Sequence, residues 1–68
     1  MSQIYVVYDH PKDYPNFFVI REWQNEIPKE VVFTSNDLDV VRGFLLMRGL
    51  VNIGRFYEHD PKILEVWM

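Results

Sequence analysis

Residues 35–49, S-N-D-L-D-V-V-R-G-F-L-L-M-R-G, form the only stretch of this chain with a clear helical period. At 100° per residue, the apolar side chains gather on one half of the helical wheel and leave Asp39, Arg42 and Gly43 on the other. A helix with one apolar face must pack against another element, which the rest of the chain has to supply. The apolar half contains Leu38, Val40, Val41, Phe44, Leu45 and Met47.

Both ends of this helix are marked in the sequence. Ser35 or Asn36 can accept hydrogen bonds from the first free amides, and Asp37 adds negative charge near the positive end of the helix dipole. Gly49 is the expected left-handed residue after the last turn, and Leu50 can fold back onto that turn. The sequence therefore predicts a helix that starts shortly after residue 34 and ends before residue 49.

Strand-like stretches rich in β-branched and aromatic residues flank the helix on both sides. The order predicts one α+β domain over residues 1–68: a small, mostly antiparallel sheet of pattern β-β-β-α-β-β with one helix packed on one face. Residues 9–16 form a long loop with two prolines, and residues 25–29 form a turn around Pro28. The predicted strands are residues 4–8, 17–24, 30–34, 51–57 and 63–68.

Alternation along each strand assigns side chains to the two faces of the sheet. In the first strand, Ile4, Val6 and Tyr8 share one face and Tyr5 and Val7 share the other. In the second strand, Phe17, Val19, Arg21 and Trp23 share a face, opposite to Phe18, Ile20 and Glu22. In the last strand, Ile63, Glu65 and Trp67 are expected on one face.

Composition narrows the class of protein. The 68 residues contain no cysteine, which excludes disulfides and thiolate metal sites and fits a reducing cytoplasm. The net charge of −3 is the wrong sign for general nucleic-acid binding. No apolar run approaches membrane-spanning length, so we expect a soluble cytoplasmic protein without a membrane partner. No catalytic or cofactor motif is recognisable, which disfavours an enzyme and predicts no cofactor.

Aromatic residues make up 16% of the chain, more than one small core readily buries. Both faces of the first two strands are apolar, whereas one helix can cover only one of them. Leu46 also lies on the polar side of the helix. These features favour a surface covered by a partner, and the simplest partner is a second copy of the chain. The residues expected on this surface are Tyr5, Val7, Phe18, Ile20, Leu46 and Trp67.

Two short stretches, residues 8–13 (Y-D-H-P-K-D) and 57–62 (Y-E-H-D-P-K), each set a histidine among acids, a proline and a lysine. If each element reverses the one before it, both stretches lie at the same end of the sheet as the helix N-terminus. Turn residues explain both stretches more simply, since Asp and Pro are common in turns. A ligand site at this end would use His10, His59, Lys12, Lys62, Ser35 and Asn36, and a metal site would use His10, His59, Asp9 and Asp60.

Three segments carry a resemblance to other proteins. Residues 5–15 (Y-V-V-Y-D-H-P-K-D-Y-P), 18–23 (F-V-I-R-E-W) and 60–67 (D-P-K-I-L-E-V-W) are similar to stretches of short uncharacterised bacterial and phage proteins. The resemblance spans most of the chain. It implies a compact stand-alone unit and implies no activity.

The sequence leaves three functions open. The first is a small interaction or regulatory accessory protein, as a homodimer or with another protein. The second is a small-ligand or metal-binding protein that uses the histidine loops. The third is single-stranded nucleic-acid binding, since aromatic residues on an antiparallel sheet are typical of RNA platforms. Such platforms have basic surroundings, so the acidic composition of this chain disfavours the third.

Overall fold

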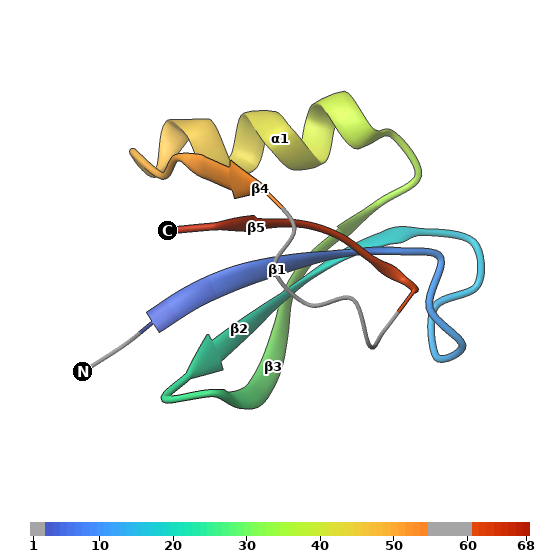
Figure 1. Ribbon diagram of the computed structural model, residues 1–68. Helices are drawn as coiled ribbons and strands as arrows, with labels where there is room; N and C mark the ends of the chain where they lie inside the picture. The colour runs from blue at the N-terminus through green and yellow to red at the C-terminus, as the bar shows by residue number, and fades with distance from the viewer. Residues whose placement is uncertain (1–2, 55–60) are drawn as a thin grey trace.

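The computed structural model describes residues 3–54 and 61–68. Neighbouring strands in the sheet are antiparallel, in the spatial order β3-β2-β1-β5-β4, and one helix packs on one face (Figure 1). The predicted α+β class and element order are confirmed. The elements are β1 (Gln3–Asp9), β2 (Phe18–Gln24), β3 (Ile27–Ser35), α1 (Leu38–Met47), β4 (Asn52–Gly54) and β5 (Ile63–Trp67).

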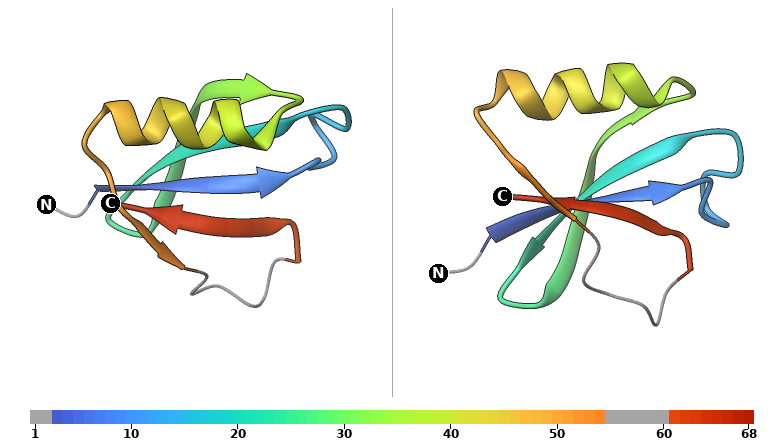
Figure 2. Two further views of the ribbon diagram at one scale, coloured as in Figure 1. Left: turned by 90° about the horizontal axis from the view of Figure 1, so that it is seen from above. Right: turned by 45° about the horizontal axis from the view of Figure 1, so that its top comes forward.

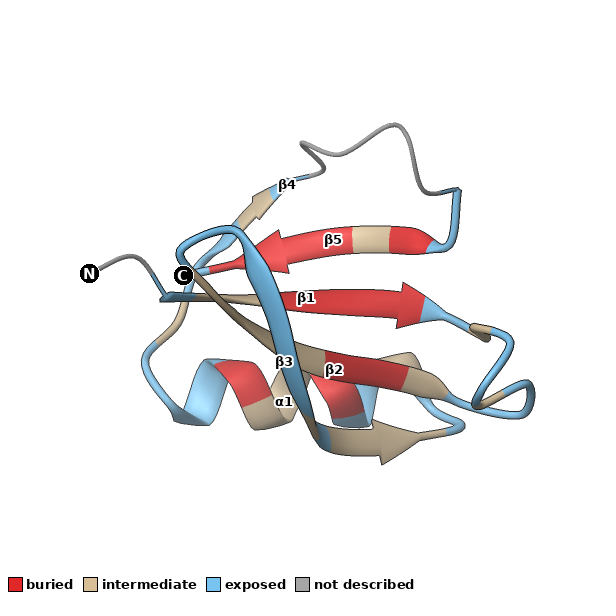
Figure 3. Ribbon diagram, turned by 90° about the horizontal axis from the view of Figure 1, so that it is seen from below, coloured by how far each residue is buried: buried red, intermediate tan, exposed pale blue. Residues whose placement is uncertain are grey.

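The centre of the sheet is buried on both faces. Val6 and Val7 are neighbours in β1 and point to opposite faces, and both are 0% exposed. Within the sheet, Figure 3 shows the buried residues concentrated in β1, β2 and β5, while β3 and β4 at the edges are more exposed. One sheet thus separates two apolar clusters.

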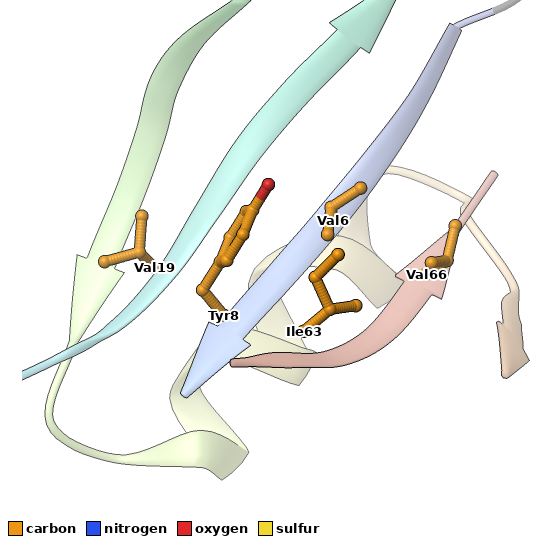
Figure 4. Packing of buried hydrophobic residues seen from close by; sticks show 5 residues of the cluster. All are labelled: Val6, Tyr8, Val19, Ile63 and Val66. Atoms are coloured by element: carbon orange, nitrogen blue, oxygen red, sulfur yellow. The ribbon is translucent and has the colours of Figure 1, made fainter. Parts of the chain in front are cut away.

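The helix-side cluster lies between the sheet and α1. It consists of Val7, Ile20, Val41, Leu45 and Trp67. The helix-free cluster lies on the other face, and its five side chains stand together over β1, β2 and β5 (Figure 4). It consists of Val6, Tyr8, Val19, Ile63 and Val66.

The predicted alternation of side chains between the two faces is confirmed for β1 and β2, because successive residues belong to opposite clusters. Ile4, Val6 and Tyr8 belong to the helix-free side, while Tyr5 and Val7 belong to the helix side. In β2, Val19 and Trp23 lie on the helix-free side, and Phe18 and Ile20 lie beneath α1.

Alternation in β5 fails because of a β-bulge. Val7 of β1 pairs with Glu65, but the next residue, Tyr8, pairs with Ile63. One extra residue on β5 therefore puts Ile63 and Glu65 on opposite faces. The prediction that Ile63, Glu65 and Trp67 share a face is wrong: Ile63 packs in the helix-free cluster, and Trp67 packs beneath the helix.

The placement of the predicted partner surface is also wrong. Most of its residues were expected on the face that the helix leaves uncovered, but they pack beneath α1. The reason is that α1 covers the Val7 face of the sheet rather than the Val6 face. Only Leu46, at 62% exposure, lies on the surface as predicted. The five misplaced residues are Tyr5, Val7, Phe18, Ile20 and Trp67.

The apolar stripe of α1 is narrower than the wheel predicts. Val41 and Leu45 are fully buried, whereas Val40 and Met47 are 48% and 91% exposed. Phe44 lies at the flank, where its ring stacks on Phe33 of β3 at a centroid distance of 4.4 Å. The helix is therefore anchored by a central row and one aromatic contact.

The C-terminal end of α1 is as predicted, whereas the N-cap is a different residue from the two predicted. Asp37, rather than Ser35 or Asn36, is the N-cap, and its carboxylate accepts a 2.9 Å hydrogen bond from the amide of Asp39. At the other end, the amide of Leu50 donates to the carbonyl of Leu45, and Gly49 has φ +76°. This geometry is the Schellman stop that the sequence predicts.

The connection between β2 and β3 is tighter than predicted. Asn25 and Glu26 alone form the turn, with φ values of +51° and +68°. Two successive residues with positive φ are typical of a two-residue hairpin turn, whose twist matches that of the flanking strands. Pro28 lies inside β3 rather than in a turn, which an outer strand tolerates because one side of its backbone needs no ladder partner.

One ion pair ties α1 to β5. The guanidinium of Arg42 donates to both carboxylate oxygens of the buried Glu65, at 3.2 and 3.0 Å. Asn52 and the indole of Trp67 also donate to this carboxylate, at 3.1 and 3.0 Å. Burial alone would raise the pKa of Glu65, but the hydrogen bonds from Arg42 and Trp67 hold it below its usual value.

Replacing Arg42 with alanine should lower the free energy of unfolding at pH 7 by about 1–3 kcal/mol, because a buried carboxylate loses its cation. The pKa of Glu65 in the folded protein is below the ordinary value of 4.5. Its stabilising contribution is therefore present above that value and is lost as the pH falls through the folded pKa. Urea denaturation from neutral to acid pH should show the wild type and Arg42→Ala converging.

The matched control is Arg48→Ala, at the C-cap of the same helix, where the guanidinium lies 4.4 Å from the centre of the Phe44 ring. The loss of unfolding free energy caused by Arg48→Ala should stay about the same at acid pH. A gap between wild type and Arg42→Ala that stays constant into acid would contradict the assigned role of Glu65.

Replacing Glu26 with glycine should stabilise the protein by about 0.5–1 kcal/mol, because a left-handed conformation is strained for a residue with a Cβ atom. The measurement is the free energy of unfolding in urea. Glu26→Gln is the control, since it removes the charge and keeps the Cβ atom, and it should leave stability near that of the wild type. A loss of stability in Glu26→Gly would rule out the assigned turn.

Candidate functional site

A pocket of about 680 Å³ opens on the helix-free face of the sheet. Most of its lining is apolar or aromatic, and its charged groups are two lysines, one arginine and one aspartate. Ligand pockets in proteins share this combination of an apolar lining with a few polar groups. The lining residues are Tyr8, Pro11, Lys12, Asp13, Val19, Arg21, Trp23, Pro28, Pro61 and Lys62.

The floor of the pocket comes from the two central hairpin strands. Tyr8 of β1 and Val19 of β2 are paired across the ladder and belong to the helix-free cluster. Trp23 lies further along β2 on the same face, and its indole N–H donates a 3.1 Å hydrogen bond to the hydroxyl of Tyr8. This bond fixes two aromatic side chains relative to each other.

One wall is the loop between β1 and β2, which begins at His10. The amide of His10 donates to the carbonyl of Phe17, so the loop closes where the ladder ends. The amide of Tyr14 donates to the carbonyl of Pro11 at 3.0 Å, and the ring of Tyr14 packs against the helix-free cluster. The loop therefore folds back over the sheet and is held by its own backbone.

Arg21 connects this wall to the opposite one. Its guanidinium donates a 2.7 Å hydrogen bond to the carbonyl of Lys29 in β3 and a 3.3 Å hydrogen bond to the carboxylate of Asp13 in the loop. The side chain of Arg21 is 27% exposed, and that of Asp13 is 57% exposed. A cation thus lies between the two sides of the pocket.

The prediction about direction is confirmed for the described elements. β1 and β3 both run antiparallel to β2, so Asp9 and Ser35 lie at the same end of the sheet. β4 runs the same way as β1, since both are antiparallel to β5. The backbone amide of Asp9 also donates to the carbonyl of Lys62 at 2.7 Å. His59 lies outside the described residues.

The predicted ligand residues divide between two sides of this end. Lys12 and Lys62 line the pocket on the helix-free face. His10 instead packs its ring edge against Phe18, at a centroid distance of 4.8 Å, and Phe18 belongs to the helix side. Ser35 accepts a hydrogen bond from the amide of Asp37, in the connection to the helix, where Asn36 is exposed. The five predicted ligand residues that the structure describes are thus divided between the two sides, and the sixth, His59, lies outside the described residues.

Of the predicted metal ligands, Asp9 and His10 are in contact, with 2.5 Å between the Asp9 carboxylate and Nδ1 of His10. His59 and Asp60 lie outside the described residues. Among residues 3–54 and 61–68, no three His, Cys, Asp or Glu side chains come close enough together to hold a metal ion. The metal site stays a prediction from sequence.

Sequence reasoning missed how the prolines and Asp13 contribute to the site. The alternation in β2 does place Val19, Arg21 and Trp23 on one face, and all three line the pocket. The available signal was the length of the loop over residues 9–16, since long loops in small domains are often functional. Which face this loop covers depends on packing, which the local pattern does not reveal.

Comparisons with protein-family models, curated proteins and solved structures found no match to this chain. In the part of the chain that the structure describes, the helix is not long or apolar enough to cross a membrane.

Proposed function

We propose that this protein binds a small organic molecule with a ring-containing, mainly apolar body in the pocket on the helix-free face. The observation that carries the proposal is the pocket itself, with its volume of about 680 Å³ and its lining of Tyr8, Val19, Trp23 and three prolines. Known ligand pockets are of this size and combine an apolar lining with a few polar groups. The proposed role is binding without a chemical step.

Rigidity of the lining supports this proposal. Proline has a fixed φ, so Pro11, Pro28 and Pro61 lose little conformational entropy when a ligand binds. Trp23 and Tyr8 are already oriented by their mutual hydrogen bond. A ring entering the pocket would meet preformed aromatic surface, which favours offset or edge-to-face contact.

Titration with the neutral probe N-phenyl-1-naphthylamine should give saturable binding by fluorescence, with NMR shifts at the indole N–H of Trp23. Trp23→Ala should weaken binding about tenfold, equivalent to ~1.4 kcal/mol, because the probe loses its largest contact. Near-UV circular dichroism and an amide NMR spectrum would establish that this variant remains folded.

The matched control is Phe17→Ala, which removes an aromatic side chain that is 39% exposed and is not part of the pocket lining. It should leave the affinity unchanged. Either of two results would refute the proposal: no saturable binding to the wild type, or equal weakening by both variants.

We propose self-association as a second role, because residues with exposed apolar side chains follow one another at the end of α1 and at the C-terminus. Figure 2 shows these two segments on the same side of the molecule. Leu46 and Met47 lie in the last turn of α1. Val51 and Met68 follow nearby, and they exchange two backbone hydrogen bonds of 2.9 and 3.0 Å. A second copy could cover these side chains, and this surface replaces the sheet face that the sequence favoured.

Sedimentation equilibrium tests this role. The wild type should exceed the mass of one chain at high micromolar concentration, and the double variant Leu46→Ser, Met47→Ser should sediment as one chain. The control is Val40→Ser, which also removes an exposed apolar side chain but lies near the start of α1. A wild type that stays at the mass of one chain would exclude the homodimer.

A further inference from the structure

The two hydrogen bonds of Arg21 differ in a way that bears on which ligand the pocket accepts. The bond to the carbonyl of Lys29 is short, at 2.7 Å, and it joins β2 to the neighbouring strand β3. The bond to Asp13 is 3.3 Å long, whereas charge-assisted bonds are usually about 2.7–2.9 Å. The first bond therefore positions the guanidinium, and the second is weak.

Solvent further weakens the contact between Arg21 and Asp13. The carboxylate side chain of Asp13 is 57% exposed, and exposed ion pairs contribute little to stability. The loop that carries Asp13 is held by other contacts, namely the turn from Pro11 to Tyr14 and the packing of the Tyr14 ring. Asp13 can therefore leave Arg21 without unfolding the wall of the pocket.

Arg21 and Lys12 leave donors for a ligand. A guanidinium has five N–H donors, and Arg21 uses two of its nitrogens on the groups named above. The exposed Lys12 makes no hydrogen bond or ion pair with the residues that the structure describes. Both cations line the same pocket, so the charge of this site is opposite to the net charge of −3 of the chain.

We propose that the pocket selects organic anions, in which a carboxylate or sulfonate is attached to a ring, and that Asp13 competes with this anionic group for Arg21. The inference rests on the proposed binding function and specifies its ligand class. On binding, the ring occupies the floor at Trp23 and Tyr8, and the anion takes the place of the Asp13 carboxylate. Lys12 provides a second cation at the rim. Asp13 thereby sets the affinity for anions.

Two probes with the same ring skeleton isolate the contribution of the charge. N-phenyl-1-naphthylamine is neutral, and 1-anilinonaphthalene-8-sulfonate carries one added sulfonate. The wild type should bind the sulfonate several-fold more tightly. This preference should shrink as salt rises from about 0.05 to about 0.5 M, because exposed charges are screened. NMR shifts at the Trp23 indole N–H would show that both probes occupy this pocket.

Variants assign the preference to named residues. Asp13→Asn should raise the affinity for the sulfonate about threefold and leave the neutral probe unchanged, because the competitor for Arg21 loses its charge. Lys12→Gln should lower the affinity for the sulfonate by a similar factor. Glu30→Gln is the control for net charge, since it removes one negative charge from β3 at a residue outside the pocket lining, and it should change neither affinity.

Three outcomes would overturn the inference. Equal affinity of the wild type for both probes would remove the selectivity while the binding function stands. An equal gain of affinity for the sulfonate in Asp13→Asn and Glu30→Gln would mean that the net charge of the protein, and not competition for Arg21, sets this affinity. If neither probe binds, the proposed function fails and this inference fails with it.

Discussion

The fold depends on one constraint: a single sheet carries two apolar faces, and one helix can cover only one of them. Val6 and Val7 are consecutive and fully buried, so both faces have to be excluded from water. α1 covers the Val7 face. On the Val6 face, the cover comes from separate side chains, among them Tyr14 from the loop and Trp23 from β2. Separate rings and prolines pack less continuously than a helix, and the pocket lies among them.

This constraint also explains the high aromatic content without a partner on the sheet. Phe18 and Phe33 pack beneath or beside the helix, and Tyr8 and Trp23 pack on the opposite face of the sheet. In a chain of 68 residues, large rings cover two faces with few residues. Most aromatic residues in the described part of the chain therefore pack in or against the two clusters inside the protein.

Much of this structure could be predicted from the sequence because the signals are local. The helix, its glycine stop, the order of elements, and the alternation in β1 and β2 follow from period and composition. The bulge in β5 could not be predicted, since it lies in the pairing of β5 with β1, two strands from opposite ends of the chain. The choice of covered face is also a tertiary property, because both faces of β1 are equally apolar.

The site was predictable only in part, for a related reason. Alternation placed Arg21 and Trp23 on one face, and counting strand directions placed the loop at the correct end. The prediction grouped His10 with Lys12, but the structure places His10 against Phe18 on the helix side and Lys12 in the lining of the pocket on the other side. The two residues are two positions apart, and His10 between the strand and the loop has a left-handed φ of +50°. Backbone reversals of this kind leave little trace in a pattern.

Pro28 in β3 has a consequence for how this protein meets its own copies. β3 is an outer strand of nine residues, and such a strand can template the addition of another chain through its backbone. Pro28 supplies no N–H, and the charged Lys29 and Glu30 follow it directly. The opposite outer strand, β4, spans three of the residues that the structure describes. Growth of the sheet from molecule to molecule is thus discouraged at both margins, which protects a strand-rich chain from forming fibrils.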